Sequence, residues 1–255
     1  MANPSKPRIL LADDTNDSQF VVAKLLERHG YSVTVVSDGH EAIAAWEQQP
    51  FDAILMDVQM PGLDGFRTTE AIRDRERTSG RPAIPVVALT GHTGDENRQL
   101  CLRAGMTTHL AKPIEPQHLL AMLEGLLDAG SGPTESQPRG AEGFELGAET
   151  LLARMEGDVE LVRKLIDFFE RDRPVLMDQI RKAIEAKDAS SLEFAAHRLS
   201  GLVRNFGAAG AAQSAIKLET LARDEDLAGA SAVFKGVSLE IDRLSAALQA
   251  IYAQL

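Results

Sequence analysis

FDAILMDVQMPGLDGF, residues 51–66, contains the stretch that decides the fold: a short apolar run, AILMD, that ends in an acidic residue. Four further runs of the same β-rich kind lie on either side of it: RILLA, YSVTVV, IPVVAL and THLA. An amphipathic segment of about 10 to 14 residues follows each run, as expected of helices. Five such strand–helix units predict an α/β fold, in which helices cover both faces of a parallel sheet.

Length and composition exclude several classes of protein. A chain of 255 residues is long for one domain of about 100 to 200 residues, so two domains are expected. With 38 acidic and 27 basic residues, the chain lacks the excess of positive charge that binding to the phosphate backbone of nucleic acids normally requires. No nucleic acid partner is therefore expected. Cys101 is the single cysteine, which excludes an internal disulfide and thiolate metal clusters. Without a signal peptide or an apolar run of roughly 18 residues, no membrane insertion and a cytoplasmic location are expected.

A Gly-, Pro-, Ser- and Glu-rich stretch divides the chain at residues 128–148, and it is predicted to be a flexible linker. It separates an α/β domain at 6–127 from a domain at 149–255 in which no strand pattern remains. Helical patterns in the second domain predict an antiparallel four-helix bundle. Its helices are expected near 158–187, 189–206, 208–223 and 227–253, with Pro174 kinking or splitting the first of them.

Polar side chains stand at the carboxyl ends of the predicted strands. Open parallel sheets bind ligands beyond these ends, where neighbouring strands send their connections to opposite sides. In the strand order 2-1-3-4-5, Asp13, Asp14 and Asp57 converge on one crevice; their mutual repulsion requires a cation, and oxygen ligands favour Mg²⁺. Lys112 and the hydroxyl of Thr90 reach toward the same point and can hold a phosphoryl group. The alternative is that the acidic pair only caps a helix and the lysine only precedes a turn.

The motifs around this site resemble a response-regulator receiver domain of two-component signalling. The resemblance rests on ILLADDT, DGHEAI, FDAILMDVQMPGLDGF, IPVVALTG and GMTTHLAKPI, which in this order cover the first 127 residues. It implies a doubly wound, flavodoxin-like sheet of five parallel strands in the order 2-1-3-4-5. It also implies that Asp57 is the phosphoacceptor, that Asp14 binds Mg²⁺ directly and Asp13 through water, and that the backbone carbonyl of Gln59 is a further ligand.

The same resemblance gives Thr90 and Lys112 the role of binding the phosphoryl oxygens. A carboxylate can attack an activated phosphoryl donor when a metal ion and a lysine neutralise the charge that gathers on the transferred group. Receivers usually place Tyr or Phe three residues before this lysine, where this chain has His109. The coupling of that side chain to Thr90 is therefore expected to be weaker or different. A metal-ligand role for His109 is disfavoured, because no partner with ligand spacing is near it.

The second half has one histidine, within SSLEFAAHRLSGLVRNF (190–206). The apolar residues of this segment form a helical stripe, and at about 100° per residue His197 lies roughly 160° from the centre of the stripe. It is therefore expected to face water. Gly201 follows one turn on, Arg204 two turns on, and Phe194 precedes it by one turn. A glycine beside an exposed imidazole leaves room for another protein, although an ordinary surface histidine would have the same pattern.

AAHRLSGLVRNFGAAG resembles the motif of histidine phosphotransfer domains, which are four-helix bundles, and this resemblance covers residues 149–255. It implies that His197 is a phosphoacceptor that exchanges a phosphoryl group with a docked receiver. The family often has lysine three residues after the histidine, where this chain has Ser200. We expect Arg204, within about 20° of His197 on the helical wheel, to supply part of the missing positive charge. The alternative is that Arg204 is an ordinary solvated arginine.

Together the two halves predict a phosphorelay protein without an ATP site of its own. Asp57 would accept a phosphoryl group from a phosphohistidine on a histidine kinase, and His197 would exchange it with Asp57 or with another receiver. The chain shows no glycine-rich phosphate loop or DNA-binding output domain, so its output is expected to be a partner protein rather than an enzymatic product.

Two alternatives stay open. One is an adapter whose bundle binds partners without phosphotransfer; the other is the tail of a hybrid histidine kinase, although Met1 before the first strand favours a natural start.

Overall fold

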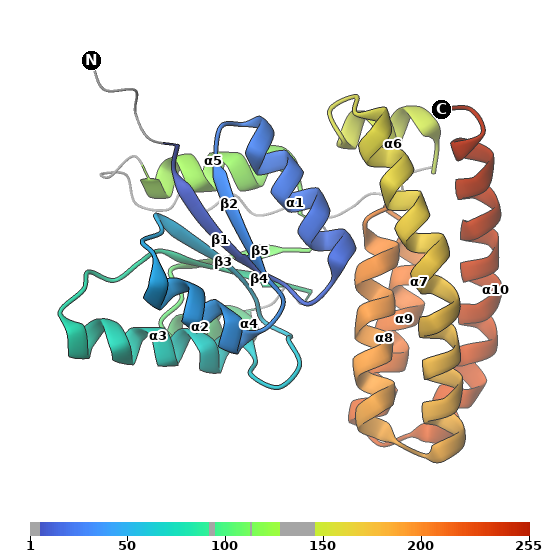
Figure 1. Cartoon of the computed structure of the whole chain (residues 1–255). Coiled ribbons are helices and arrows are strands. Elements are labelled where there is room, and N and C mark those ends of the chain that lie inside the picture. The colour runs from blue at the N-terminus through green and yellow to red at the C-terminus, as the bar shows by residue number, and fades with distance from the viewer. Residues whose placement is uncertain (1–5, 92–94, 113, 128–145) are drawn as a thin grey trace. The chain divides into compact units, whose positions relative to one another are not determined.

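The computed structural model describes residues 6–91, 95–112, 114–127 and 146–255. The chain divides into two compact units, Met1–Pro138 and Arg139–Leu255 (Figure 1). The predicted linker at 128–148 lies almost wholly outside the described residues, and its last residue, Ala148, already begins a helix. Among the described residues, no helix combines the length and the apolar character needed to cross a membrane.

The described part of the first unit contains a parallel sheet of five strands in the order β2-β1-β3-β4-β5, as predicted. The strands are β1 (Arg8–Ala12), β2 (Ser32–Val36), β3 (Ala53–Asp57), β4 (Val86–Thr90) and β5 (Thr108–Ala111). Every residue of the central strands β3 and β4 is buried. Because helices cover both faces of such a sheet, these strands are apolar on both faces rather than alternating, up to Asp57 and Thr90 at their carboxyl ends.

Two layers of helices enclose this sheet. They are α1 (Asn16–Arg28), α2 (Gly39–Gln48), α3 (Gly65–Ser79), α4 (Asp95–Arg103) and α5 (Pro116–Leu127). Along β1, Ile9 and Leu11 pack with residues of α1 and α5, whereas Leu10 and Ala12 pack with residues of α2, α3 and α4. Figure 1 shows the same division, with α1 and α5 on one side of the sheet. The alternation follows from the two-residue period of a strand.

The turn after β3 is held close to Asp57 by a glycine. The N–H of Gly65, the first residue of α3, donates to the Val58 carbonyl at 2.9 Å. A Cβ atom built on Gly65 would lie 2.1 Å from the carbonyl oxygen of Asp57. A residue without a side chain is therefore needed at this point, and it lets α3 begin directly beside the strand end that carries the acidic residue.

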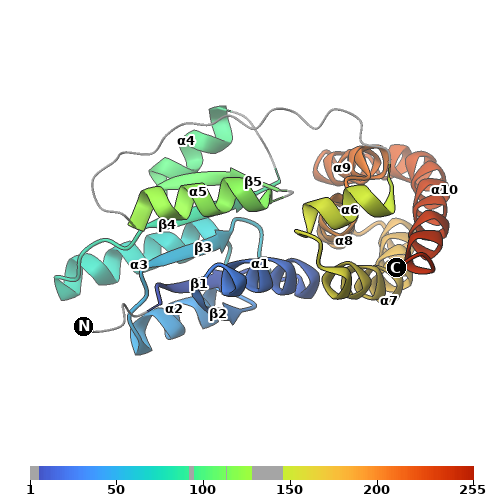
Figure 2. The same ribbon diagram turned by 90° about the horizontal axis from the view of Figure 1, so that it is seen from above.

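In the second unit, the described residues form an antiparallel bundle of α7 (Val159–Ala186), α8 (Ala189–Arg204), α9 (Ala209–Arg223) and α10 (Leu227–Tyr252). A short helix, α6 (Ala148–Arg154), packs against α7. Figure 2 looks along the bundle, with α6 at its near end. The four long helices were predicted to within a few residues at each end, and α6 was not predicted.

Pro174 does not split α7, which is one helix from Val159 to Ala186. Buried residues lie on both sides of the proline, among them Phe169 before it and Leu176 after it. The ring of Phe169 also meets that of Phe206 edge-on, with the centroids 5.4 Å apart. A proline inside a helix costs about 3 kcal/mol. Packing along both halves of α7 outweighs that cost, and this is the reason that the helix continues.

Candidate functional site

Three carboxylates meet at the carboxyl end of the sheet. Asp13 and Asp14 follow β1, and Asp57 ends β3, the strand that pairs with β1. One carboxylate oxygen from each of the three lies within 4.8 Å of the others. Asp13 and Asp57 are buried and Asp14 is partly buried. The strand order predicted from the sequence is thus what brings these acids together, because the ends of adjacent parallel strands share one edge.

Lys112 joins two of the carboxylates. Its Nζ lies 2.9 Å from Oδ2 of Asp13 and 2.6 Å from Oδ2 of Asp57, and the side chain is 13% exposed. Burial acts to lower the pKa of the ammonium group, but the charges of Asp13 and Asp57 and the hydrogen bonds to them outweigh it and raise the pKa. Lys112 therefore stays protonated and supplies one fixed positive charge against three acidic groups.

Asp13 is held by the start of α1 as well as by Lys112. It accepts hydrogen bonds from the Thr15 N–H at 2.9 Å, the Thr15 hydroxyl at 2.5 Å and the Ser18 hydroxyl at 2.7 Å. Burial acts to raise the pKa of Asp13, but the Lys112 charge and these bonds lower it overall. The helix N-cap is Thr15, so the acidic pair does not serve as the cap of α1.

Asp17, in the first turn of α1, was not among the predicted site residues. It is buried, and burial together with the charge of Asp13 raises its pKa. Its position about one helical turn after Asp13 and Asp14 was a sequence signal that Asp17 lies beside the predicted metal site.

Thr90 and Gln59 lie at the same edge of the sheet as the carboxylates, and His109 lies two residues before the end of β5. Thr90, buried at the end of β4, accepts a hydrogen bond from Nδ2 of Asn97 at 2.6 Å. The Thr90 carbonyl accepts the N–H of Lys112 at 2.7 Å, which ties the ends of β4 and β5 together. Gln59 donates its N–H to Oδ1 of Asp57 at 3.2 Å. His109 is partly buried on β5 and is paired in register with Ala88.

The donor set of this cluster fits a hard divalent cation. All three acidic side chains offer carboxylate oxygens, the ligand type that Mg²⁺ prefers. Within the described residues, no other three His, Cys, Asp or Glu side chains bring their ligand atoms this close together. Mutual repulsion among the carboxylates, offset by only one lysine, favours a bound cation. His109 does not belong to this cluster.

His197 lies on α8 in the second unit and is more buried than expected. Its side chain is 17% exposed, and its Nδ1 lies 3.4 Å from Oε2 of Glu219, a residue of α9 that is itself 2% exposed. The prediction that His197 faces water is therefore corrected. The helical wheel placed it correctly away from the main apolar stripe, but α9 packs along α8 and covers that flank.

The neighbours of His197 on α8 differ in exposure. A Cβ atom built on Gly201 would meet nothing within 4 Å, so there is open space beside the histidine, as predicted. Phe194 is 41% exposed, and the guanidinium of Arg198 lies 5.9 Å from its ring centroid. Ser200, which stands where the resemblance leads one to expect lysine, is buried.

Arg204 is partly buried rather than freely solvated. Burial lowers the pKa of its guanidinium, and attraction to the Glu219 carboxylate acts in the opposite direction. A positive charge therefore lies on the side of α8 that carries His197, close enough to Glu219 to be attracted by it. Glu219 was not among the predicted site residues, although its place on the apolar stripe of α9, between Ala215 and Ala222, indicates a polar contact with another helix.

Two family comparisons identify these units. Residues 9–124 match the family described as the response regulator receiver domain, and residues 164–251 match the Hpt domain. The chain carries a receiver domain followed by an Hpt domain. These are the two phosphoacceptor modules of phosphorelay signalling, and each contains one of the two predicted acceptors, Asp57 and His197.

Three similar proteins illustrate the relationship. The sensor histidine kinase GacS of Pseudomonas protegens is 32% identical over 94% of this chain and 27% of its own length. BarA of Escherichia coli, a signal transduction histidine-protein kinase, is 27% identical over 76% of this chain and 21% of its own length. The receiver domain of the sensor histidine kinase PA1611 from Pseudomonas aeruginosa, solved with magnesium in its active site cleft, is 38% identical over 49% of this chain and 99% of its own, with a TM-score of 0.45. The chain thus spans about a quarter of the length of the curated relatives it matches.

Proposed function

We propose that Asp57 of the receiver domain accepts a phosphoryl group from a phosphohistidine, and that His197 of the Hpt domain exchanges this group with Asp57 or with another receiver. The observation that carries the proposal is the contact of Lys112 with Asp57 at 2.6 Å inside a cluster of three carboxylates. Lys112, together with a cation held by the carboxylates, can neutralise the charge of a phosphoryl group placed at Asp57. The similarity to GacS and BarA supports a sensor histidine kinase as the donor.

The chemistry at Asp57 is a transfer between two acceptors. A carboxylate oxygen of Asp57 attacks phosphorus, the bond from phosphorus to the donor imidazole breaks, and its electron pair stays on the imidazole nitrogen. Lys112 neutralises charge on the transferred group, and the Thr90 hydroxyl donates a hydrogen bond to it. Mg²⁺, held by Asp13, Asp14, Asp57 and the Gln59 carbonyl, would supply further positive charge at the phosphoryl oxygens.

Phosphate stability in acid and base tests this proposal. The full chain is incubated with Mg²⁺ and a phosphorylated donor kinase as wild type, Asp57→Asn and His197→Gln. We expect base-labile phosphate on the receiver, acid-labile phosphohistidine on the Hpt domain, and loss of the phosphohistidine in both variants. A wild-type chain that takes up no phosphate from any sensor kinase offered would contradict the proposal. Phosphohistidine that persists in Asp57→Asn would contradict the route from Asp57 to His197.

A phosphorylation-switched adapter is the second candidate, and a buried serine, Ser200, at the position where the family often has lysine favours it. In that case Asp57 alone would carry phosphate, and the bundle would bind a partner without reacting. His197→Gln separates the two functions: an adapter keeps signalling with this substitution, whereas a relay stops.

Replacing Arg204 with alanine is expected to slow phosphoryl transfer to His197 about fivefold, equivalent to ~1 kcal/mol of barrier, because a positive charge near the acceptor is lost. Single-turnover transfer from the phosphorylated receiver measures this rate. Arg181→Ala, which removes an exposed arginine of α7 paired with Asp178 and Glu185, is the control and should leave the rate unchanged. Equal transfer rates for wild type and Arg204→Ala would show that Arg204 does not contribute to phosphoryl transfer at His197.

A further inference from the structure

We propose that Asn97 is a positioning residue for Thr90: its side-chain amide donates to the Thr90 hydroxyl oxygen, so that the hydroxyl proton points to the phosphoryl group on Asp57. This inference rests on the proposed function of Asp57 and adds a residue of α4 to that site. Its basis is the 2.6 Å contact between Nδ2 of Asn97 and Oγ1 of Thr90. The contact joins the end of β4 to the first turn of the helix that follows it.

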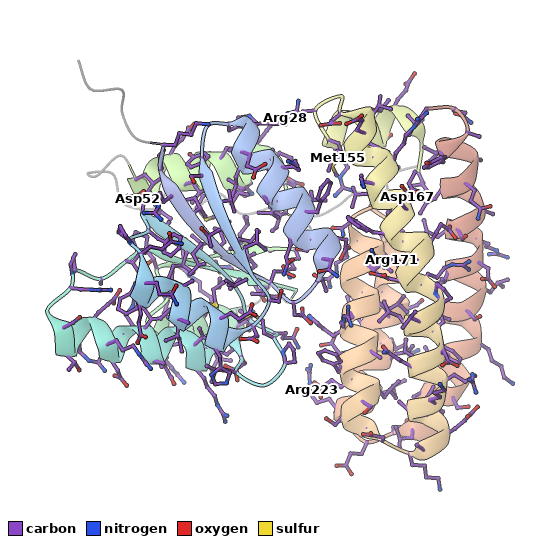
Figure 3. The ribbon with its side chains drawn as sticks, viewed as in Figure 1. Arg28, Asp52, Met155, Asp167, Arg171 and Arg223 are labelled. Atoms are coloured by element: carbon purple, nitrogen blue, oxygen red, sulfur yellow. The ribbon has the colours of Figure 1, made fainter. Side chains whose placement is uncertain are left out.

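The backbone of Thr90 is fixed next to the phosphoacceptor. Asp57, the last residue of β3, pairs in register with Leu89, the residue before Thr90. The Thr90 carbonyl accepts the Lys112 N–H at 2.7 Å, which holds the same residue to the end of β5. Figure 3 labels Asp52, the residue before β3, which lies at the opposite edge of the sheet. Because its backbone is held on both sides, Thr90 can adjust only through rotation of its side chain, and a β-branched side chain has few rotamers.

The direction of the bond from Asn97 restricts the Thr90 proton. A threonine hydroxyl has one proton and two lone pairs, whereas the amide nitrogen of asparagine is only a donor. When an amide hydrogen points at Oγ1, the hydroxyl proton cannot point toward Nδ2, because two hydrogens would meet. About a third of the rotation of the hydroxyl is thereby closed. A hydroxyl that accepts one bond is also a stronger donor to another, since linked hydrogen bonds polarise one another.

Burial makes the orientation of this hydroxyl important for transfer. Thr90 is 2% exposed, and Asn97 is partly buried. Hydrogen bonds in such surroundings are electrostatically stronger than in water. A proton that is oriented before the phosphoryl group arrives needs no reorganisation during transfer, which is the advantage of preorganised donors. Thr90 only donates a hydrogen bond to the phosphoryl oxygen and keeps its proton, so the bonds that form and break at Asp57 are unchanged.

Beryllofluoride, a phosphoryl mimic that binds to a carboxylate in the presence of Mg²⁺, tests the inference without phosphotransfer. Fluorine NMR of the full chain measures its affinity for Asp57. We expect Asn97→Leu, which removes the donor, to weaken binding about threefold. Asn97→Asp, which turns the Thr90 proton toward a carboxylate, should weaken it about tenfold. Transfer from a phosphorylated kinase should slow by similar factors. Gln99→Leu, which removes an exposed amide of the same helix, is the matched control and should change neither quantity.

Substitutions of Thr90 separate a positioning role of Asn97 from a structural one. In Thr90→Val, which keeps the shape but lacks the hydroxyl, Asn97→Leu should have no further effect on affinity or rate. In Thr90→Ser, which keeps the hydroxyl, it should again weaken binding and slow transfer. If Asn97→Leu does not fold, Asn97→Ala answers the same question.

Three results distinguish the possible errors. An equal loss in the Thr90→Val background would show that Asn97 only supports the start of α4, and it would overturn the inference. Tighter binding of beryllofluoride in Asn97→Leu would also overturn it, because Thr90 would then donate to Asn97 instead of the mimic. A chain that shows the expected response to beryllofluoride but takes no phosphate from any kinase offered would contradict only the proposed function.

Discussion

Replacing Lys112 with methionine is expected to separate two properties of the receiver site: phosphoryl transfer to Asp57 falls at least about a hundredfold, while Mg²⁺ binds more tightly. Transfer falls because the ammonium 2.6 Å from Asp57 no longer neutralises the charge that develops on the phosphoryl group. Mg²⁺ binding becomes tighter because Lys112 competes for Asp13 and Asp57, two of the three carboxylates expected to bind the ion. At an effective dielectric constant near 20, removal of one such competing charge corresponds to at least about tenfold in affinity.

Calorimetric titration with Mg²⁺ measures the affinity, and single-turnover transfer from a phosphorylated kinase measures the rate. Lys24→Met is a matched control, since Lys24 is an exposed lysine of α1 that pairs with Glu27. It should leave both quantities unchanged. Weaker Mg²⁺ binding in Lys112→Met would show that the lysine organises the carboxylates for the metal instead of competing with it.

The receiver site could be predicted from the sequence because its residues lie at strand ends. The apolar runs fix the strands, and once the order of β1 and β3 is known, the residues after them must share one edge of the sheet. The contacts of loops and helix starts were not predicted in the same way. The bond from Asn97 to Thr90 and that from Ser18 to Asp13 depend on where α4 and α1 begin relative to the sheet.

The Hpt site shows where the sequence pattern is insufficient. The spacing of the apolar residues along α8 places His197 away from the apolar stripe of that helix, but a helical wheel describes one helix by itself. Whether that surface meets water or another helix depends on the rotation of α9 about its own axis. The apolar stripe of α9 carries Glu219 among Ala215, Leu218 and Ala222, and this stripe turns the glutamate toward α8. A charged residue on an apolar stripe is therefore a useful signal of a polar contact between helices.

Arg73→Met is expected to destabilise the receiver domain by about 3 to 5 kcal/mol, the largest effect on stability that we predict. The Arg73 side chain is 15% exposed and joins three segments of the domain. From α3, it donates to the Gly105 carbonyl at 2.9 Å, to the Ile84 carbonyl at 2.8 Å and to Glu76 at 2.7 Å. Glu76 in turn accepts the Ile84 N–H at 2.8 Å. Removal of the arginine leaves the 4% exposed carboxylate of Glu76 without its counter-ion and two carbonyls without their donor.

Urea unfolding of the full chain measures this effect, because Trp46, the only tryptophan, is buried in the receiver core and its fluorescence reports that domain alone. The matched control is Arg77→Met, which removes an exposed arginine of the same helix paired with Asp74 and should change stability by less than about 1 kcal/mol. The double variant Arg73→Met/Glu76→Met should recover part of the loss, because no buried charge is then left alone. A double variant less stable than Arg73→Met would instead show that the Glu76 bond to the Ile84 N–H, and not the ion pair, holds β4 to α3.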